Sequence, residues 1–150
     1  AQEFIDAYFA GFPGVRGYID QTLEDARRTG VVRTLTGRRR LVPELTSKNV
    51  QVRAAAERET VNMPIQGTAA DVLKKAMIAA TTALESYNSG RRQPSRMILT
   101  VHDELLFEAP EENAEEVSGL VRETMEGAFP LAVPLTVDVG IGGNWKEAKP

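Results

Sequence analysis

Apolar residues recur with helical spacing over most of the N-terminal half of the chain. In residues 2–10, for example, Phe4, Ile5, Tyr8 and Phe9 fall on one face of a helix. The later segments show comparable apolar stripes, and polar or glycine-containing breaks separate them. The pattern predicts helices at residues 2–10, 14–29, 48–61 and 68–87.

Branched apolar runs interrupted by short polar breaks predict two β-hairpins. The first hairpin covers residues 31–42 and turns at Thr36-Gly37, and the second covers residues 97–108. A further helix is expected at residues 111–128, where acidic residues in the first turn suit the helix dipole. The last predicted element is a strand at residues 135–141.

Helices and antiparallel strands are segregated along the chain, without the alternation of a parallel sheet, so the predicted class is α+β. We expect helices packed on a small antiparallel sheet, in one core or in two small lobes. Pro64 lacks a backbone donor and predicts a break or a kink before the helix at residues 68–87. Trp145 is expected to anchor the C-terminal tail in the core.

Composition narrows the classes of protein that fit. The 150 residues are 42% hydrophobic and 26% charged and include no cysteine, which excludes disulfides and thiolate metal sites. No apolar run is long enough for a membrane span, and no secretory leader opens the sequence, so we expect a cytoplasmic protein. The first helix has no N-cap residue, which predicts that the sequence is a piece of a longer protein.

Charge is distributed unevenly. Residues 1–100 carry 15 basic and 10 acidic side chains, whereas residues 101–150 carry 3 and 11. Thirteen of the basic residues are arginine, which suits bidentate phosphate contacts. Arg38, Arg39 and Arg40 follow each other, and a solvated edge strand and a phosphate contact explain them about equally well.

The polar break of the second hairpin is the most informative local feature. His102, the only histidine, stands beside the carboxylates of Asp103 and Glu104 at the expected tip. Adjacent carboxylates repel each other and must be solvated or neutralised by a cation, so a hard metal ion is a candidate ligand. A solvated turn is the simpler interpretation, and the hairpin alone favours it. Asn62 and Gln66 likewise suit base contacts but are more often surface residues.

Five strings in register resemble the C-terminal end of the family A DNA polymerases, the DNA polymerase I type. The resemblance covers essentially the whole chain, and its strength lies in the order and spacing of the strings. They are Thr36-Gly37-Arg38-Arg39-Arg40, Asn62-Met63-Pro64, Gln66-Gly67-Thr68-Ala69-Ala70-Asp71, Val101-His102-Asp103-Glu104 and Gly140-Ile141-Gly142-Gly143-Asn144-Trp145.

The resemblance implies part of a right-hand polymerase domain, with residues 1–61 in the distal fingers and residues 62–150 in the palm. It implies that Asp103 is one of two aspartates that bind two Mg²⁺ ions and that Glu104 supports this catalytic site. The resemblance also implies four DNA-binding residues, Arg58, Asn62, Gln66 and His102. In the family, Arg58 would face the template and the primer-template junction, Asn62 and Gln66 would contact DNA beside the active site with Gln66 on the minor-groove side, and His102 would lie near the primer terminus.

The implied partners are primer-template DNA, deoxynucleoside triphosphates and the rest of the polymerase chain. We expect a monomer that does not bind a membrane. The second metal-binding aspartate and the helix that grips the incoming nucleotide are absent from these 150 residues. The fragment alone is therefore expected to be inactive. A non-catalytic DNA-binding remnant is the alternative function, and a nuclease would need more acidic residues near Asp103.

Overall fold

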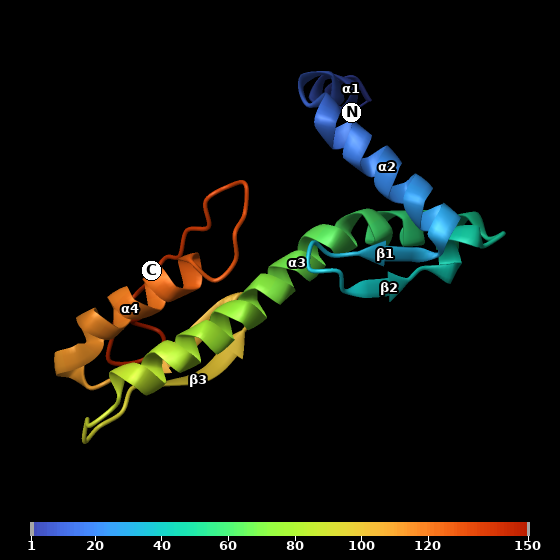
Figure 1. The fold of residues 1–150 in the computed structure, drawn as a ribbon. Coiled ribbons are helices and arrows are strands. Elements are labelled where there is room, and N and C mark those ends of the chain that lie inside the picture. The colour runs from blue at the N-terminus through green and yellow to red at the C-terminus, as the bar shows by residue number, and fades with distance from the viewer. Residues whose placement is uncertain (1, 150) are drawn as a thin grey trace. The chain divides into compact units, whose positions relative to one another are not determined.

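Helices and two small antiparallel sheets make up the regular structure, as predicted (Figure 1). The structure is a computed structural model that describes residues 2–149. Its first unit, unit 1, ends at Ala69, and unit 2 begins at Ala70. No helix within the described residues is long and apolar enough to cross a membrane. The elements are α1 (Gln2–Gly11), α2 (Pro13–Thr29), β1 (Val31–Arg33), β2 (Arg39–Leu41), the 3₁₀ turn η1 (Pro43–Thr46), α3 (Val50–Tyr87), β3 (Arg96–Val101), β4 (Glu104–Glu108), the 3₁₀ turn η2 (Glu111–Asn113) and α4 (Ala114–Glu126).

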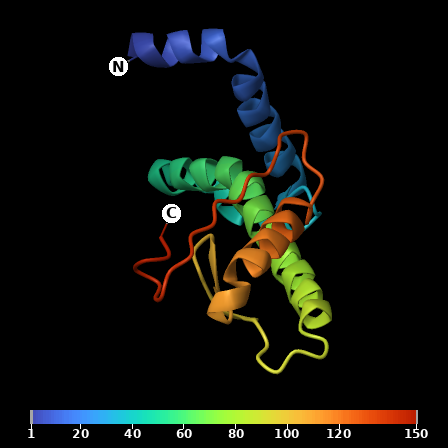
Figure 2. The ribbon, with the colours of Figure 1, turned by 90° about the vertical axis from the view of Figure 1, so that its left-hand side faces the viewer.

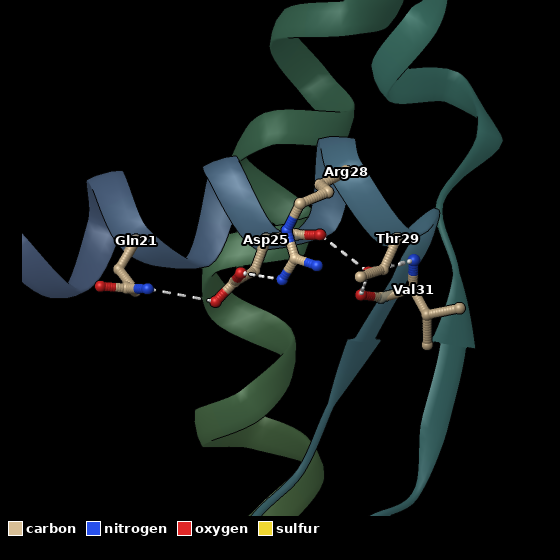
Figure 3. Close-up of polar contacts among 5 residues, drawn as sticks. All are labelled: Gln21, Asp25, Arg28, Thr29 and Val31. Atoms are coloured by element: carbon tan, nitrogen blue, oxygen red, sulfur yellow. Dashed lines mark hydrogen bonds and ion pairs between the residues drawn. The ribbon is translucent and has the colours of Figure 1, made fainter.

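The C-terminal end of α2 fixes the start of β1 (Figure 3). Gly30 adopts φ 72°, a left-handed conformation that ends the helix, and its N–H donates to the carbonyl of Ala26. One turn earlier, the Asp25 carboxylate accepts hydrogen bonds from Arg28 at 2.6 Å and from Gln21 at 3.3 Å. The hydrogen bond from Arg28 has the largest effect in lowering the pKa of the Asp25 carboxyl, and the hydrogen bond from Gln21 lowers it further. Thr29 bridges the helix to β1 because its hydroxyl contacts backbone atoms of both.

The β1–β2 ribbon packs on the N-terminal part of α3. Val32, Val42 and Leu45 form a buried cluster with Ala26 of α2 and Ala56 of α3. Two exposed ion pairs tie the neighbouring elements to α3, Arg27 to Glu57 at 2.6 Å and Arg40 to Glu59 at 2.5 Å. Each such exposed pair contributes only about 0–1 kcal/mol, so the buried cluster is the main reason why the ribbon stays on the helix.

The prediction of two separate helices on either side of Pro64 is wrong. Helix α3 runs through the proline, and the helices expected at 48–61 and 68–87 form one element of 38 residues. Pro64 has no N–H to donate to the carbonyl of Thr60, four residues earlier. The next carbonyl, that of Val61, accepts a hydrogen bond from the Tyr18 hydroxyl at 3.0 Å, so a contact from α2 lies beside the position where the proline removes a helix hydrogen bond.

A second contact holds the tip of the β1–β2 ribbon on α3. The Leu35 N–H donates to the Thr68 hydroxyl at 3.0 Å, and this hydroxyl donates in turn to the carbonyl of Pro64. Gly67 gives the ribbon room, because a Cβ atom there would lie 2.6 Å from the Cγ2 of Thr34. A glycine inside a helix is normally unfavourable, so its position here is explained by the close approach of the ribbon.

Unit 2 is built around the C-terminal half of α3, the β3–β4 hairpin and α4. Leu84, Val117 and Val121 form its buried cluster, and Phe107 of β4 packs against them. Strands β3 and β4 pair from Arg96 opposite Glu108 to Val101 opposite Glu104, with a bulge between Met97 and Leu99. The predicted helix at 111–128 is confirmed as η2 followed by α4, with Glu115 and Glu116 in the first turn of α4.

Two predictions for the C-terminal segment are wrong. Residues 135–141 form no strand (Figure 2). The Val137 N–H donates to the Glu126 carboxylate at 2.9 Å instead of to a neighbouring strand. Trp145 is 43% exposed and does not anchor the tail in the core. A tight turn explains its position, because the Ala148 N–H donates to the carbonyl of Asn144 at 3.0 Å and folds the tail back on itself.

Candidate nucleic-acid and metal site

The tip of the β3–β4 hairpin is a two-residue turn made of His102 and Asp103. Val101 and Glu104 form the last pair of the strands, so only the histidine and the aspartate lie outside the ladder. His102 has φ 54°, the only positive φ of a non-glycine residue in residues 2–149. A non-glycine residue in the left-handed conformation costs about 1–3 kcal/mol and persists only where the surrounding structure imposes it. Such residues cluster at functional sites. The turn therefore uses a histidine where a glycine or an asparagine would be easier.

Both carboxylates of the tip face solvent. Asp103 and Glu104 are exposed, and neither carboxylate has a hydrogen bond or an ion pair with another described residue. By contrast, Glu108 at the other end of the hairpin lies 3.9 Å from Arg96. Hard cations prefer such free carboxylate oxygens. No group of three or more potential ligands gathers anywhere in residues 2–149, so the tip fits part of a metal site and would need ligands from elsewhere.

A stripe of polar side chains lies on α3. Arg58, Asn62 and Gln66 follow each other at four-residue spacing, which places them on one side of the helix, and all three are exposed. None of the three side chains has a hydrogen bond or an ion pair within the described part of the chain. Arg58 and Asn62 also line an open apolar hollow together with Ile19 and Leu23 of α2. The stripe offers one cation and two amides to a ligand that approaches from solvent.

The structure thus brings the predicted site residues together in two groups. His102, Asp103 and Glu104 share the hairpin tip of unit 2, and Arg58, Asn62 and Gln66 share the α3 stripe of unit 1. The division into a distal fingers portion (residues 1–61) and a palm portion (residues 62–150) stays a prediction, because the two compact units reflect how the chain packs and not what each part does.

The sequence interpretation missed the second arginine of a cross-strand pair. It considered Arg38, Arg39 and Arg40 but not Arg33, which lies directly opposite Arg39 in the β1–β2 ribbon. The sequence offered no signal for this pair, because the turn predicted at Thr36-Gly37 would place Arg33 opposite Arg40, whereas the observed register is centred on Thr36.

The chain belongs to DNA polymerase family A, since residues 1–147 match that family. The α+β fold, the acidic hairpin tip and the exposed arginine-and-amide stripe are consistent with this family, which the motifs had suggested.

The similar proteins are bacterial DNA polymerases I. The chain is 54% identical over 149 residues to the thermostable DNA polymerase I of Thermus aquaticus, a match that covers 99% of this chain and 17% of the relative. It is 53% identical over 148 residues to DNA polymerase I of Mycobacterium bovis, which covers 99% of this chain and 16% of the relative. The chain therefore spans about a sixth of the length of these relatives.

A solved structure supports the fold. The POL domain of Pol1 from M. smegmatis, in a complex with DNA primer-template and dNTP, superposes with a TM-score of 0.87 at 50% sequence identity. The match covers 96% of this chain and 25% of that chain.

Proposed function

We propose that this chain supplies part of the active site of a DNA-directed DNA polymerase, in which a primer 3′-hydroxyl attacks the α-phosphorus of a deoxynucleoside triphosphate. The attack forms a phosphodiester bond and releases pyrophosphate. The hairpin tip carries the proposal, because Asp103 and Glu104 are free carboxylates beside a strained His102 in a chain of family A. Such an enzyme works where the chromosome is, which agrees with the expected cytoplasmic location.

Asp103 is the proposed metal ligand of the tip, and Glu104 supports it. Two bound Mg²⁺ ions would lower the pKa of the primer hydroxyl and neutralise the charge of the triphosphate and of the leaving pyrophosphate. Phosphoryl transfer depends on positioning and charge neutralisation, which explains why the chain offers carboxylates rather than a nucleophile. The tip alone provides too few ligands, so the other metal-binding aspartate must come from the rest of the polymerase chain.

The α3 stripe is the proposed contact to primer-template DNA. Gln66 and Asn62 each donate and accept hydrogen bonds, and acceptors in the minor groove differ little between base pairs. Amides can therefore hold a correctly shaped pair without reading its sequence, as copying any template requires. Arg58 adds a guanidinium for the template strand, and His102 is proposed to lie near the primer terminus.

The fragment alone should incorporate no nucleotide. Residues 1–150 hold one half of the proposed metal site, so primer extension with Mg²⁺ should be undetectable, whereas the full-length polymerase should extend the same primer. The assay is gel-resolved single-nucleotide addition, with chelation of Mg²⁺ as a second arm that should abolish extension by the full-length protein.

Two results would contradict this assignment. Mg²⁺-dependent extension by the purified fragment would mean that the site is complete within it. A full-length protein that binds primer-template DNA without extending it would favour the non-catalytic remnant.

A further inference from the structure

The two faces of the β1–β2 ribbon differ in what they contact. Partners directly opposite each other in an antiparallel pair point to the same face. Val32 is opposite Arg40, and this face is turned to α3, because Val32 is 5% exposed and Arg40 pairs with Glu59. The other pairs, Arg33 with Arg39 and Val31 with Leu41, must therefore point away from α3. We call this the outer face of the ribbon.

The backbones of Arg33 and Arg39 lie closer together than those of a hydrogen-bonded cross-strand pair. The Val42 N–H donates to the carbonyl of Gly30 at 3.1 Å, and the Thr34 N–H donates to the carbonyl of Arg38 at 3.0 Å. The residue pairs on either side of the ladder, 30 with 42 and 34 with 38, are therefore hydrogen-bonded pairs. Hydrogen-bonded and non-hydrogen-bonded pairs alternate, so the arginines form a non-hydrogen-bonded pair with Cα atoms about 4.5 Å apart. Two like charges at this separation destabilise a hairpin.

No carboxylate relieves this repulsion. Both residues are exposed, and neither the Arg33 nor the Arg39 side chain has a hydrogen bond or an ion pair within residues 2–149. The other arginines of the ribbon are engaged, since Arg40 pairs with Glu59 and Arg38 has contacts inside the chain. A bound anion would turn the repulsion into attraction, because two guanidinium groups can donate to one phosphate together.

We propose that the outer face of the ribbon binds the unpaired template strand, with Arg33 and Arg39 donating to one phosphodiester. This inference rests on the proposed polymerase function and adds a contact that the α3 stripe does not provide. The pair reads no base edge, which suits an enzyme that copies every sequence.

The apolar part of the outer face favours a single strand over a free nucleotide or a duplex. Leu41 is 74% exposed on this face, beside Val31, and Leu35 at the ribbon tip is 73% exposed. Unpaired bases present apolar faces that this surface can cover, whereas a duplex hides them. Cations next to apolar surface are the usual combination in single-strand binding sites. Unit 1 also carries Arg58, the residue proposed to face the template at the primer-template junction.

Equilibrium binding to two substrates tests the proposal in the full-length polymerase. One primer-template has a 5′ template overhang of about 12 nucleotides, within the usual range of single-strand sites, and the other is the same duplex with a blunt end. Arg33→Glu should weaken binding of the overhang substrate about tenfold more than binding of the blunt duplex. Arg39→Ala should lower the salt dependence of overhang binding by about 0.7 in the log–log slope, the value for one lost single-strand phosphate contact.

Arg33→Glu also separates binding from a structural role. It places an opposite charge beside Arg39, so the thermal midpoint should stay the same or rise while overhang binding falls. A ribbon edge that is merely solvated would keep its affinity for both substrates. Arg92→Glu is the charge-matched control, because Arg92 is an exposed loop residue whose side chain has no hydrogen bond or ion pair with another described residue.

Three results would overturn the proposal. These are an equal loss of affinity for both substrates, an equal loss with Arg92→Glu, and a loss confined to the affinity for deoxynucleoside triphosphate. Failure of the polymerase assignment is distinguishable, because it would show as a full-length protein that binds primer-template DNA without extending the primer, whatever the overhang measurements give.

Discussion

Replacing Asp103 with alanine in the full-length polymerase should reduce the rate of nucleotide addition roughly 10³-fold or more. Asp103 is exposed in the two-residue turn and engages no other described residue, so its removal breaks no contact within the chain. The loss should therefore fall on chemistry rather than on folding. We expect the affinity for primer-template DNA to stay nearly unchanged, because the α3 stripe is intact.

Single-turnover kinetics under saturating DNA and nucleotide measure this effect directly. Glu108→Ala is a suitable control, since Glu108 is an exposed carboxylate of the same hairpin but lies at the end away from the tip. The control should keep its rate within a few-fold because its ion pair with Arg96 is exposed and weak. Near-normal turnover in Asp103→Ala, or an equal loss in Glu108→Ala, would contradict the assignment of Asp103 as a metal ligand.

Local pattern was enough to predict both hairpins, although the first turn lies at Leu35-Thr36, one residue earlier than predicted. Gly37 adopts φ 87° at the end of the first turn, as a glycine at that position suggests, and the polar break at His102 and Asp103 marks the second turn. These features depend on residues close in sequence. The α+β class followed for the same reason, because the order of helices and strands is itself local information.

The errors come from contacts that the sequence pattern does not display. The proline rule predicted a break or a kink at Pro64 and hence two helices, but one helix runs through the proline, and the Tyr18 hydroxyl reaches a carbonyl of α3 from 43 residues earlier in the chain. Residues 135–141 have the composition of a strand, yet a strand needs a partner, and the Val137 N–H finds the Glu126 carboxylate. Tertiary contacts decided the result in both cases.

The candidate site was predictable only as far as motifs reach. Asp103, Glu104 and the two amides of the α3 stripe lie within strings that resemble a known family, whereas Arg33 lies outside them. Only the register of β1 with β2 pairs Arg33 with Arg39. Register becomes certain once the buried face of the ribbon is known, and burial of Val32 against α2 and α3 fixes that face.

The contact between Gly67 and Thr34 predicts a substitution whose effect changes sign with its background. Gly67→Ala alone should destabilise the protein by about 1–2 kcal/mol. The added Cβ would lie 2.6 Å from the Cγ2 of Thr34, and such overpacking costs about 1–3 kcal/mol, which outweighs the gain of about 1 kcal/mol in helix propensity. Differential scanning calorimetry or denaturant unfolding of the full-length protein would measure the change.

In a Thr34→Ser background the same Gly67→Ala substitution should instead stabilise the protein, by about 0.5–1 kcal/mol. Serine lacks the methyl group that the new Cβ would strike, and the next neighbours, both atoms of Met63, are at ordinary distances of 3.6 and 3.7 Å. It keeps the hydroxyl that accepts from the Arg38 N–H at 3.1 Å, so the turn of the ribbon is preserved. The double-mutant cycle isolates the contact, because only the Cγ2–Cβ overlap differs between the two backgrounds. A destabilisation of equal size in both backgrounds would mean that the ribbon does not pack on Gly67.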